Sequence, residues 1–429
     1  MNNFKNLRGT VDLLPEELIK WQNVEELIRQ QLLRASVKEI RTPIIEMTEL
    51  FVRVIGEGTD VVNKEMYTFL DKGERSCTLR PEGTASVARA IINNRMSNKP
   101  FHKLWYMGPM FRYERPQAGR QRQFHQLGVE YIGYESSRSD VEIILLAWDI
   151  LEKLGIRELN LEINSLGDAL DRENYQKEFL KWLSKNSKEL DLDSQKRVNK
   201  NPLRILDSKN RETQRLLEDA PKLFNFLSDK SLERYSSIKK ELDFLKIPFN
   251  ENFKLVRGLD YYSHTAFEIT SGALGAQATV CGGGRYDNLI NQISGIQIPA
   301  IGFAIGMERL MILAGQDLEN ARNTDIFIVN RGDIAESFAM DLSRKLKNYD
   351  LVTELDLTGM SFSKQFKKAN KLRARVVIVI GDEEAMKEEF KIRLFSDKIE
   401  DNKEETISLK DNIKLINWIT KNFKKLQNL

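Results

Sequence analysis

Two arginine-centred segments, residues 111–130 and 255–262, carry charged side chains where a buried strand would carry apolar ones. Successive strand residues point to opposite faces of a sheet. A strand over residues 124–132 would therefore carry Gln126 and Glu130 on one face, roughly 13 Å apart at about 3.3 Å per residue. That spacing fits the two ends of a small molecule such as an amino acid. An amphipathic strand with a solvated face has the same pattern, so both interpretations stay open.

Three arginines lie in the turn-forming stretch of residues 115–122. Guanidinium groups suit phosphate oxygens, because their planar fork donates two hydrogen bonds at once. A solvated basic hairpin would also explain this loop and its Arg120. Arg112 differs, because its parity places it on the same strand face as Glu114. We therefore expect Arg112 inside a pocket rather than at the loop tip.

The turn of residues 79–84 carries Glu82 and precedes an alanine-rich helix that Thr84 could cap. Helix capping is the simpler role for Thr84. A carboxylate in such a turn can instead bind an ammonium group. Glu82 therefore becomes a candidate ligand for an amine if other polar residues converge on the same place.

Arg257 is expected in an apolar strand, where an unpaired guanidinium would be costly to bury, so it requires an anion. Asp260 could be that anion in a structural pair. A phosphate or carboxylate of a substrate is the competing choice. The hydroxyls of Tyr261 and Tyr262 add hydrogen-bonding groups for a polar ligand.

Two glycine-bearing segments permit close approach of a ligand to the backbone. Residues 281–287 are glycine-rich but match neither the dinucleotide fingerprint nor the phosphate-loop pattern. In residues 300–306, strand parity puts Gly302, Ala304 and Gly306 on one face, against which a flat base could lie. Tight helix packing would explain the small residues equally well. It would not explain Arg309, which falls in the first turn of the following helix, where it could stack on a purine or contact phosphate.

The elements that must position these residues can be read from periodicity. Pro15 is expected to open a long helix that ends near residue 36. Residues 40–45 are expected to form a proline-bearing edge strand. Strands and helices then alternate to about residue 166, a helical insertion follows over about 167–245, and the sheet resumes over 253–305. This order predicts an α+β fold with an inserted module.

A different pattern starts near residue 325. Apolar runs at 326–329, 352–355 and 376–380 alternate with helical segments at 336–346 and 361–371, which is typical of βαβ units. The chain is therefore expected to consist of a domain over residues 1–324 and a small α/β domain over residues 325–429.

Composition excludes several classes of protein. With 66 Lys+Arg against 63 Asp+Glu, the net charge of +3 gives no global nucleic-acid signal. The 2 cysteines and 3 scattered histidines disfavour a disulfide framework or a protein-ligated metal centre. An apolar signal core and a run of about 18 apolar residues are both missing, so we expect a cytoplasmic protein without membrane insertion.

Taken together, these segments resemble the class II aminoacyl-tRNA synthetases, specifically the bacterial-type histidyl-tRNA synthetases. Thr42-Pro43, residues 111–130 and residues 301–309 are similar to the three class motifs. More specific are the signatures RGLDYY at 257–262, GGRYD at 283–287 and NPLRILD at 201–207. The resemblance spans nearly the whole chain. It implies a mixed, mainly antiparallel sheet with flanking helices, a helical insertion and a C-terminal α/β anticodon-binding domain.

The resemblance also implies a role for each site residue. Histidine would be bound through its α-amino group by Glu82, Thr84 and Gln126, and through its imidazole by Glu130 and Tyr262, with Tyr261, Tyr286, Arg112 and Arg257 in the same subsite. ATP would be bound by Arg112 at the α-phosphate, Arg120 at the γ-phosphate, and Glu114 and Arg309. The catalytic residues would be Arg112, which also binds the histidine carboxylate, and Arg257, which stabilises the transferring α-phosphate.

The implied enzyme makes histidyl-adenylate from L-histidine and ATP, releases pyrophosphate with Mg²⁺, and transfers histidine to the 3′ end of its tRNA as a homodimer. One alternative is the synthetase-like regulatory subunit of ATP phosphoribosyltransferase, which generally lacks the anticodon domain and erodes the active site. A general RNA-binding module is a third interpretation, but it leaves the pocket residues unexplained.

Overall fold

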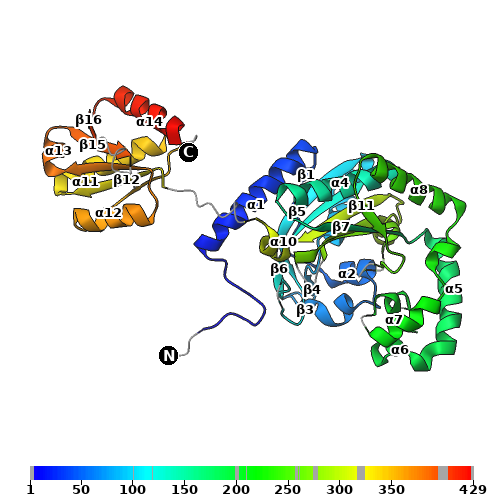
Figure 1. Cartoon of the computed structure of the whole chain (residues 1–429). Helices are drawn as coiled ribbons and strands as arrows, with labels where there is room; N and C mark the ends of the chain where they lie inside the picture. Colours follow the sequence, from blue (N-terminus) through cyan, green and yellow to red (C-terminus); the bar gives the residue numbers. More distant parts are fainter. Residues whose placement is uncertain are drawn as a thin grey trace. The chain divides into compact units, whose positions relative to one another are not determined.

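A computed structural model of the chain describes residues 4–99, 101–117, 119–198, 202–208, 210–256, 259, 261–273, 279–315, 324–394 and 404–426. The chain divides into two compact units, Met1–Glu319 and Asn320–Leu429. Both appear in Figure 1. Each unit is organised around its own sheet and hydrophobic core. Among the described residues, no helix combines the length and the apolar character that a membrane span requires.

An eight-stranded sheet organises the first unit, in the order β1-β5-β6-β11-β10-β9-β7-β8. Only the outer pairs β1–β5 and β7–β8 are parallel, so the predicted mixed, mainly antiparallel sheet is confirmed. Its strands are β1 (Lys38–Glu39), β5 (His102–Phe111), β6 (Gln123–Ile132), β7 (Leu159–Ser165), β8 (Phe249–Glu251), β9 (Ser263–Ser271), β10 (Thr279–Arg285) and β11 (Ala300–Gly306).

Four helices contribute to the core on one face of this sheet: α1 (Pro15–Arg34), α4 (Ser137–Lys153), α8 (Asp229–Phe244) and α10 (Met307–Leu313). Pro15 stands in the first turn of α1, as predicted. Leu127, Val129 and Tyr131 of β6 point into this core. The alternate residues of β6 therefore face the opposite side, where polar groups can meet a ligand.

The opposite face of the sheet is only partly covered. The helices α2 (Thr48–Ile55), α3 (Thr84–Asn93) and α9 (Leu289–Ser294) share a second core with it. Beside them lies a small antiparallel sheet of β2 (Ile45–Met47), β4 (Ser76–Leu79) and β3 (Tyr67–Leu70). The space that these elements leave above β6, β10 and β11 becomes the candidate site.

The insertion is helical, as predicted. It contains α5 (Ala169–Asn186), α6 (Leu192–Arg197) and α7 (Arg211–Leu216) with short 3-10 helices, and no strand among its described residues. Figure 1 shows these helices beside the main sheet, whereas α8 returns to cover it. Tyr235, Ile238 and Leu242 of α8 belong to the main core. The last helix of the insertion is therefore part of the framework of the first unit.

Two predicted strands do not form. Residues 40–44 connect β1 in the large sheet to β2 in the small one, which begins at Ile45, and Pro43 has no amide hydrogen to donate to a ladder. Residues 255–262 are not a strand where they are described: Leu255, Val256, Leu259, Tyr261 and Tyr262 precede β9. The neighbouring strands offer β9 partners only from Ser263 onward. Arg257, Gly258 and Asp260 lie outside the described residues.

The second unit has a five-stranded sheet in the order β13-β12-β14-β15-β16. The predicted βαβ pattern corresponds to β12 (Ile326–Arg331), α11 (Asp333–Lys347), β13 (Thr353–Leu355), α12 (Phe362–Lys371) and β14 (Val376–Gly381). Beyond that prediction are α13 (Asp382–Met386), β15 (Glu389–Leu394), β16 (Glu405–Ser408) and α14 (Asn412–Leu426). The last two strands are antiparallel to their neighbours.

Candidate active site

A cavity of about 390 Å³ lies against the face of β6, β10 and β11 that the first core leaves free. Strand parity explains its floor, because Gln126 and Glu130 alternate with the core residues of β6. Every predicted site residue that the structure describes lines this cavity, namely Glu82, Thr84, Arg112, Glu114, Arg120, Gln126, Glu130, Tyr261, Tyr262, Tyr286 and Arg309. Separate stretches of sequence therefore meet in one place. The remaining predicted residue, Arg257, lies outside the described residues.

Glu130 forms the centre of a buried polar cluster within this cavity. Its side chain is 2 % exposed. One carboxyl oxygen accepts hydrogen bonds from the Thr84 hydroxyl at 2.7 Å and the Tyr106 hydroxyl at 3.3 Å, and the other accepts one from the Tyr286 hydroxyl. Burial raises the pKa of Glu130 to about 8, although the hydroxyls of Tyr286 and Thr84 oppose that shift. The cluster therefore favours a hydrogen-bonded ligand over an apolar one.

Glu82, rather than the predicted Thr84, caps the helix α3. The Glu82 carboxylate accepts hydrogen bonds from the backbone amides of Thr84 at 3.0 Å and Ala85 at 2.8 Å, so it caps the start of α3. Thr84 does not cap the helix, because its hydroxyl donates to Glu130. Burial raises the pKa of Glu82, and its hydrogen bonds to these amides oppose the shift.

Basic side chains form another part of the cavity lining. Arg112 donates from Nε to the Pro81 carbonyl at 2.8 Å, and its guanidinium lies 5.4 Å from the centre of the Phe124 ring. Glu114 lies 3.9 Å from Arg112 and 3.4 Å from Arg120. The pKa of Arg309 is lowered by burial and by the positive charge of Arg120. Cations that repel one another across a cavity provide a site for an anion such as a polyphosphate.

The face of small residues predicted for residues 300–306 is present on β11. Gly302, Ala304 and Gly306 all line the cavity. Gly302 pairs with Glu130 across β6 and β11, and a Cβ atom there would come within 2.0 Å of a Glu130 carboxyl oxygen. At Gly306 an added Cβ would meet no atom within 4 Å. One glycine thus makes room for a protein side chain, and the other leaves space for a ligand.

Sequence reasoning missed Tyr106, Glu65 and Glu308. Tyr106 of β5 fills the space over Gly128, where a Cβ atom would lie 2.1 Å from its ring. The signal was a glycine inside a strand, which often marks close approach of another group. Glu65 and Glu308 also line the cavity. Neither lay in a pattern that distinguishes it from an ordinary surface carboxylate.

A largely antiparallel sheet with an arginine-lined cavity and a buried acidic cluster is the architecture of a class II aminoacyl-tRNA synthetase. The histidyl-tRNA synthetase family model matches residues 9–310, and an anticodon binding domain matches residues 325–418. The chain therefore belongs to the histidyl-tRNA synthetase family and is a ligase that charges tRNA with histidine.

Relatives agree over nearly the full length. A histidine–tRNA ligase of Prochlorococcus marinus (strain MIT 9515) is 74% identical over 423 residues, covering 99% of each chain. Its counterpart in Synechococcus sp. (strain WH7803) is 57% identical, covering 90% of each. The crystal structure of apo S. aureus histidyl-tRNA synthetase matches with a TM-score of 0.80 and 37% identity over 96% of this chain and 99% of that one.

The regulatory-subunit alternative is not favoured. A Bacillus halodurans structure described as an ATP phosphoribosyltransferase regulatory subunit/histidyl-tRNA synthetase shares the fold, with a TM-score of 0.65, but is 21% identical. In this chain the described active-site residues converge on one cavity, and an anticodon binding domain follows. Histidine–tRNA ligases match this chain at 57–74% identity over 90% or more of its length, which favours a charging enzyme.

Proposed function

We propose that the cavity binds L-histidine and ATP side by side and joins them as histidyl-adenylate. A carboxylate oxygen of histidine forms a bond to the α-phosphorus of ATP, and the bond from that phosphorus to the pyrophosphate leaving group breaks. This step requires alignment and charge stabilisation more than a proton-transfer base. Histidine then passes to the 3′ end of tRNA, with release of AMP.

The observation that most supports histidine as the amino acid is the hydrogen-bonded cluster around Glu130. When ionised, a carboxyl group offers about four lone-pair positions, and the hydroxyls of Thr84, Tyr106 and Tyr286 would use three of those of Glu130. An imidazole N–H is a donor of suitable size for the remaining position. Analogues that leave a buried polar group unpaired are rejected strongly, so this subsite would give specificity without an editing reaction. Tyr262, which is buried beside Tyr286, would complete it.

Gln126 becomes the main candidate for the α-amino group. Its side-chain oxygen is buried in the cavity wall and accepts no hydrogen bond from the described residues. An ammonium group would satisfy it. Glu82 is engaged with the start of α3, so its negative charge would act on the ammonium group while its oxygens keep their helix partners. Tyr261, whose hydroxyl is 3.5 Å from Glu82, would share this part of the site.

Arg112, Arg120 and Arg309 would bind the triphosphate and nucleotide, with Arg112 bridging the α-phosphate and the histidine carboxylate. Arg257, by its sequence signature, would supply the second cation on the transferring phosphate. Mg²⁺ would enter with ATP and neutralise charge on the leaving pyrophosphate. Glu65 and Glu114 suit that ion, because Mg²⁺ in nucleotide sites takes one or two carboxylates and completes its shell with phosphate and water. Burial and the negative charge of Glu114 raise the pKa of Glu65, so a cation between the two carboxylates would relieve their repulsion.

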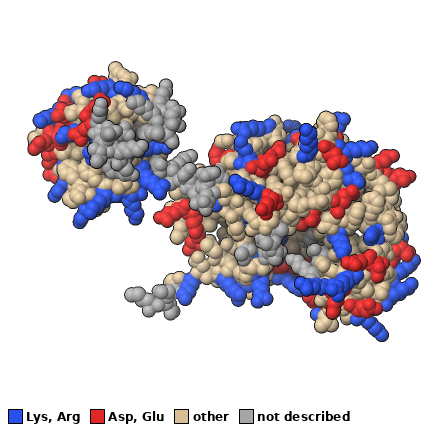
Figure 2. Space-filling view, in the orientation of Figure 1, with Lys and Arg blue, Asp and Glu red and all other residues tan. Residues whose placement is uncertain are grey.

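The domain roles follow the same proposal: residues up to about 324 activate histidine, and residues 325–429 bind the anticodon arm. Residues 361–375 contain six basic side chains and no acidic one. Figure 2 shows Lys and Arg along the lower edge of the smaller unit, where Figure 1 places α12. Of these, Lys368 also pairs with Glu354 at 2.7 Å and Arg375 lies 3.7 Å from Asp325.

The enzyme is further proposed to work as a cytoplasmic homodimer. The small sheet β2-β4-β3 exposes Ile45, Met47, Phe69 and Leu70 to solvent in the single chain, with exposed fractions of 50%, 50%, 42% and 68%. A contact between two copies would cover such a patch.

Histidine-dependent exchange of pyrophosphate into ATP tests the activation step. We expect exchange with histidine and none with other amino acids. Folded protein without exchange would overturn the proposal, and stimulation of a phosphoribosyltransferase without tRNA charging would restore the regulatory alternative.

A further inference from the structure

Arg285 is a fully buried arginine that the reaction does not use. Its side chain has an exposed fraction of 0%, and it is the last residue of β10. The next residue, Tyr286, faces the Glu130 cluster. Burying a guanidinium costs free energy unless its donors are satisfied. The contacts of the Arg285 guanidinium therefore indicate which part of the site it holds in place.

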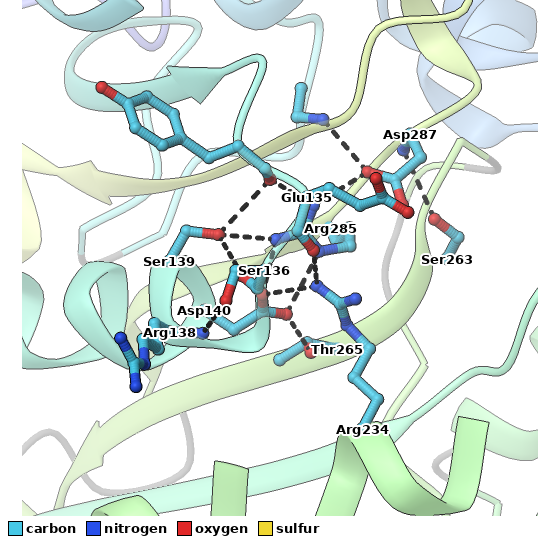
Figure 3. A network of polar contacts seen from close by, with 12 residues as sticks. Glu135, Ser136, Arg138, Ser139, Asp140, Arg234, Ser263, Thr265, Arg285 and Asp287 are labelled. Atoms are coloured by element: carbon cyan, nitrogen blue, oxygen red, sulfur yellow. Dashed lines mark hydrogen bonds and ion pairs between the residues drawn. The ribbon is translucent and has the colours of Figure 1, made fainter. Parts of the chain in front are cut away.

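All five N–H donors of Arg285 are used. Nε donates to Asp140 at 3.2 Å, and Nη1 donates to the Tyr134 carbonyl at 2.9 Å and to Asp287 at 3.0 Å. Nη2 donates to Ser139 at 2.8 Å and to the second oxygen of Asp140. Figure 3 shows these groups converging on the one guanidinium. A planar fork satisfied at every position leaves Arg285 little freedom to move.

The same contacts fix the backbone on both sides of Tyr286. Asp287 bridges the Arg285 guanidinium and the backbone amide of Ala300, at 3.0 Å each. The Tyr286 amide itself donates to the Ala300 carbonyl at 2.8 Å. Tyr286 is thus held between two anchored neighbours and against β11. Its ring direction, and hence the place of its hydroxyl, follows from that backbone.

We propose that Arg285 is a positioning residue for histidine selection, which acts by holding the Tyr286 hydroxyl against Glu130. This inference rests on the proposed role of Glu130 and Tyr286 in binding the imidazole. Because Arg285 ends β10 and all its acceptors except Asp287 come from α4 and its preceding loop, the site is anchored to the opposite core. Preorganised groups bind a ligand without an ordering cost at the moment of binding.

Arg234 of α8 provides a matched control within the same network. It donates to Asp140 at 2.9 Å, on the same oxygen that accepts from Arg285 Nη2, and to the Glu135 carbonyl at 2.6 Å, so neither hydrogen bond is to Arg285 or Asp287. Arg234→Gln should therefore lower thermal stability while leaving every donor of Arg285 satisfied. We expect its KM for histidine to stay within about twofold of the parent value.

A double-mutant cycle on the full-length enzyme tests the proposal, with KM for histidine and for ATP measured by pyrophosphate exchange. Arg285→Lys, which offers three donors without the planar fork, should raise KM for histidine roughly tenfold, as loss of a hydrogen bond to a charged group would. KM for ATP should change far less. In a Tyr286→Phe background, Arg285→Lys should raise KM for histidine little further, because the hydroxyl that Arg285 positions is already absent.

Three outcomes would overturn the inference. They are an unchanged histidine KM in Arg285→Lys, a fall in kcat alone, and full additivity with Tyr286→Phe. If Arg285→Lys does not fold, Ser139→Ala is the substitute variant, because it removes one acceptor of Nη2. It should raise KM for histidine by a smaller factor. An unchanged KM in that variant would contradict the proposal. If Tyr286→Phe and Glu130→Gln both leave histidine KM unchanged, the proposed imidazole subsite itself fails, and this inference falls with it.

Discussion

The Glu308 carboxylate accepts hydrogen bonds from two donors of one residue, His125: the backbone amide, at 2.8 and 3.1 Å to its two oxygens, and the ring Nδ1 at 3.0 Å. Trp21 of α1 packs edge-on against the same imidazole, with 5.3 Å between ring centres. This contact joins the first turn of α10 to the start of β6. It therefore fixes Arg309 and Gln126, the neighbours of these two residues, relative to each other.

Removing the Glu308 carboxylate should allow Arg309 and Gln126 to move relative to each other. Glu308→Ala leaves a part-buried amide and imidazole without their partner, which should cost about 1–3 kcal/mol of stability and raise KM for ATP and histidine together. Glu308→Gln keeps one acceptor oxygen and should lose less. Urea unfolding and exchange kinetics measure both effects. Equal losses in the two variants would show that the negative charge, rather than the hydrogen bonds, matters.

The two glycines of β11 should respond differently to an added methyl group. In Gly302→Ala the Cβ would press on Glu130 and on the Val129 carbonyl, 2.4 Å away, so we expect a loss of stability of about 1–3 kcal/mol, typical of overpacking, and loss of histidine use. In Gly306→Ala nothing is displaced within the protein. That variant should fold normally and lose affinity for ATP. Normal ATP binding would remove Gly306 from the proposed nucleotide floor.

Stability should fall as pH rises through the range in which Glu130 keeps its proton only when folded. Its ordinary pKa of 4.5 becomes about 8 in the folded protein. Between these values the native state binds more protons than the unfolded state, so stability declines with rising pH and levels off above about 8. Urea unfolding across this range measures the slope. Glu130→Gln should flatten it without abolishing it, because burial raises the pKa of Glu82 as well; an unchanged slope would contradict the assignment.

Arg257→Ala should reduce adenylate formation by a factor of about 100 or more, the scale at which loss of one electrostatic group affects a transition state. The reaction transfers the α-phosphoryl group with its nucleoside, and the remaining arginines cannot fully stabilise the negative charge on that group in the transition state. Thermal unfolding and single-turnover exchange are the two measurements. The expected pattern is a nearly unchanged midpoint with a reduced rate. Near-normal exchange would refute the role drawn from the sequence signature.

Removal of residues 325–429 should impair tRNA charging more than histidine activation. The two units have separate cores, and the whole described cavity lies in the first. Exchange and charging assays on the same truncated preparation compare the steps directly. If both activities fell together, the C-terminal unit would be required for folding or dimerisation, rather than for tRNA alone.

Much of the site could be predicted because strand periodicity is local. The alternation of Gln126 and Glu130 with Leu127 and Val129 already separates a ligand face from a core face. The charged segments, the helical insertion and the βαβ pattern of the last domain are likewise properties of neighbouring residues. The family signatures then indicated histidine and ATP, which periodicity alone could not.

Tertiary structure decided which groups meet. Thr84 and Glu130 are 46 positions apart, and Tyr286 is a further 156 from Glu130. Their hydrogen bonds depend on how β6, β10 and α3 pack, and no local pattern encodes that. The same packing gave Glu82 the helix cap expected of Thr84, placed Tyr106 over Gly128, and began β9 only at Ser263. Local sequence determined the chemistry on each element, whereas long-range strand pairing determined how those elements combine into one site.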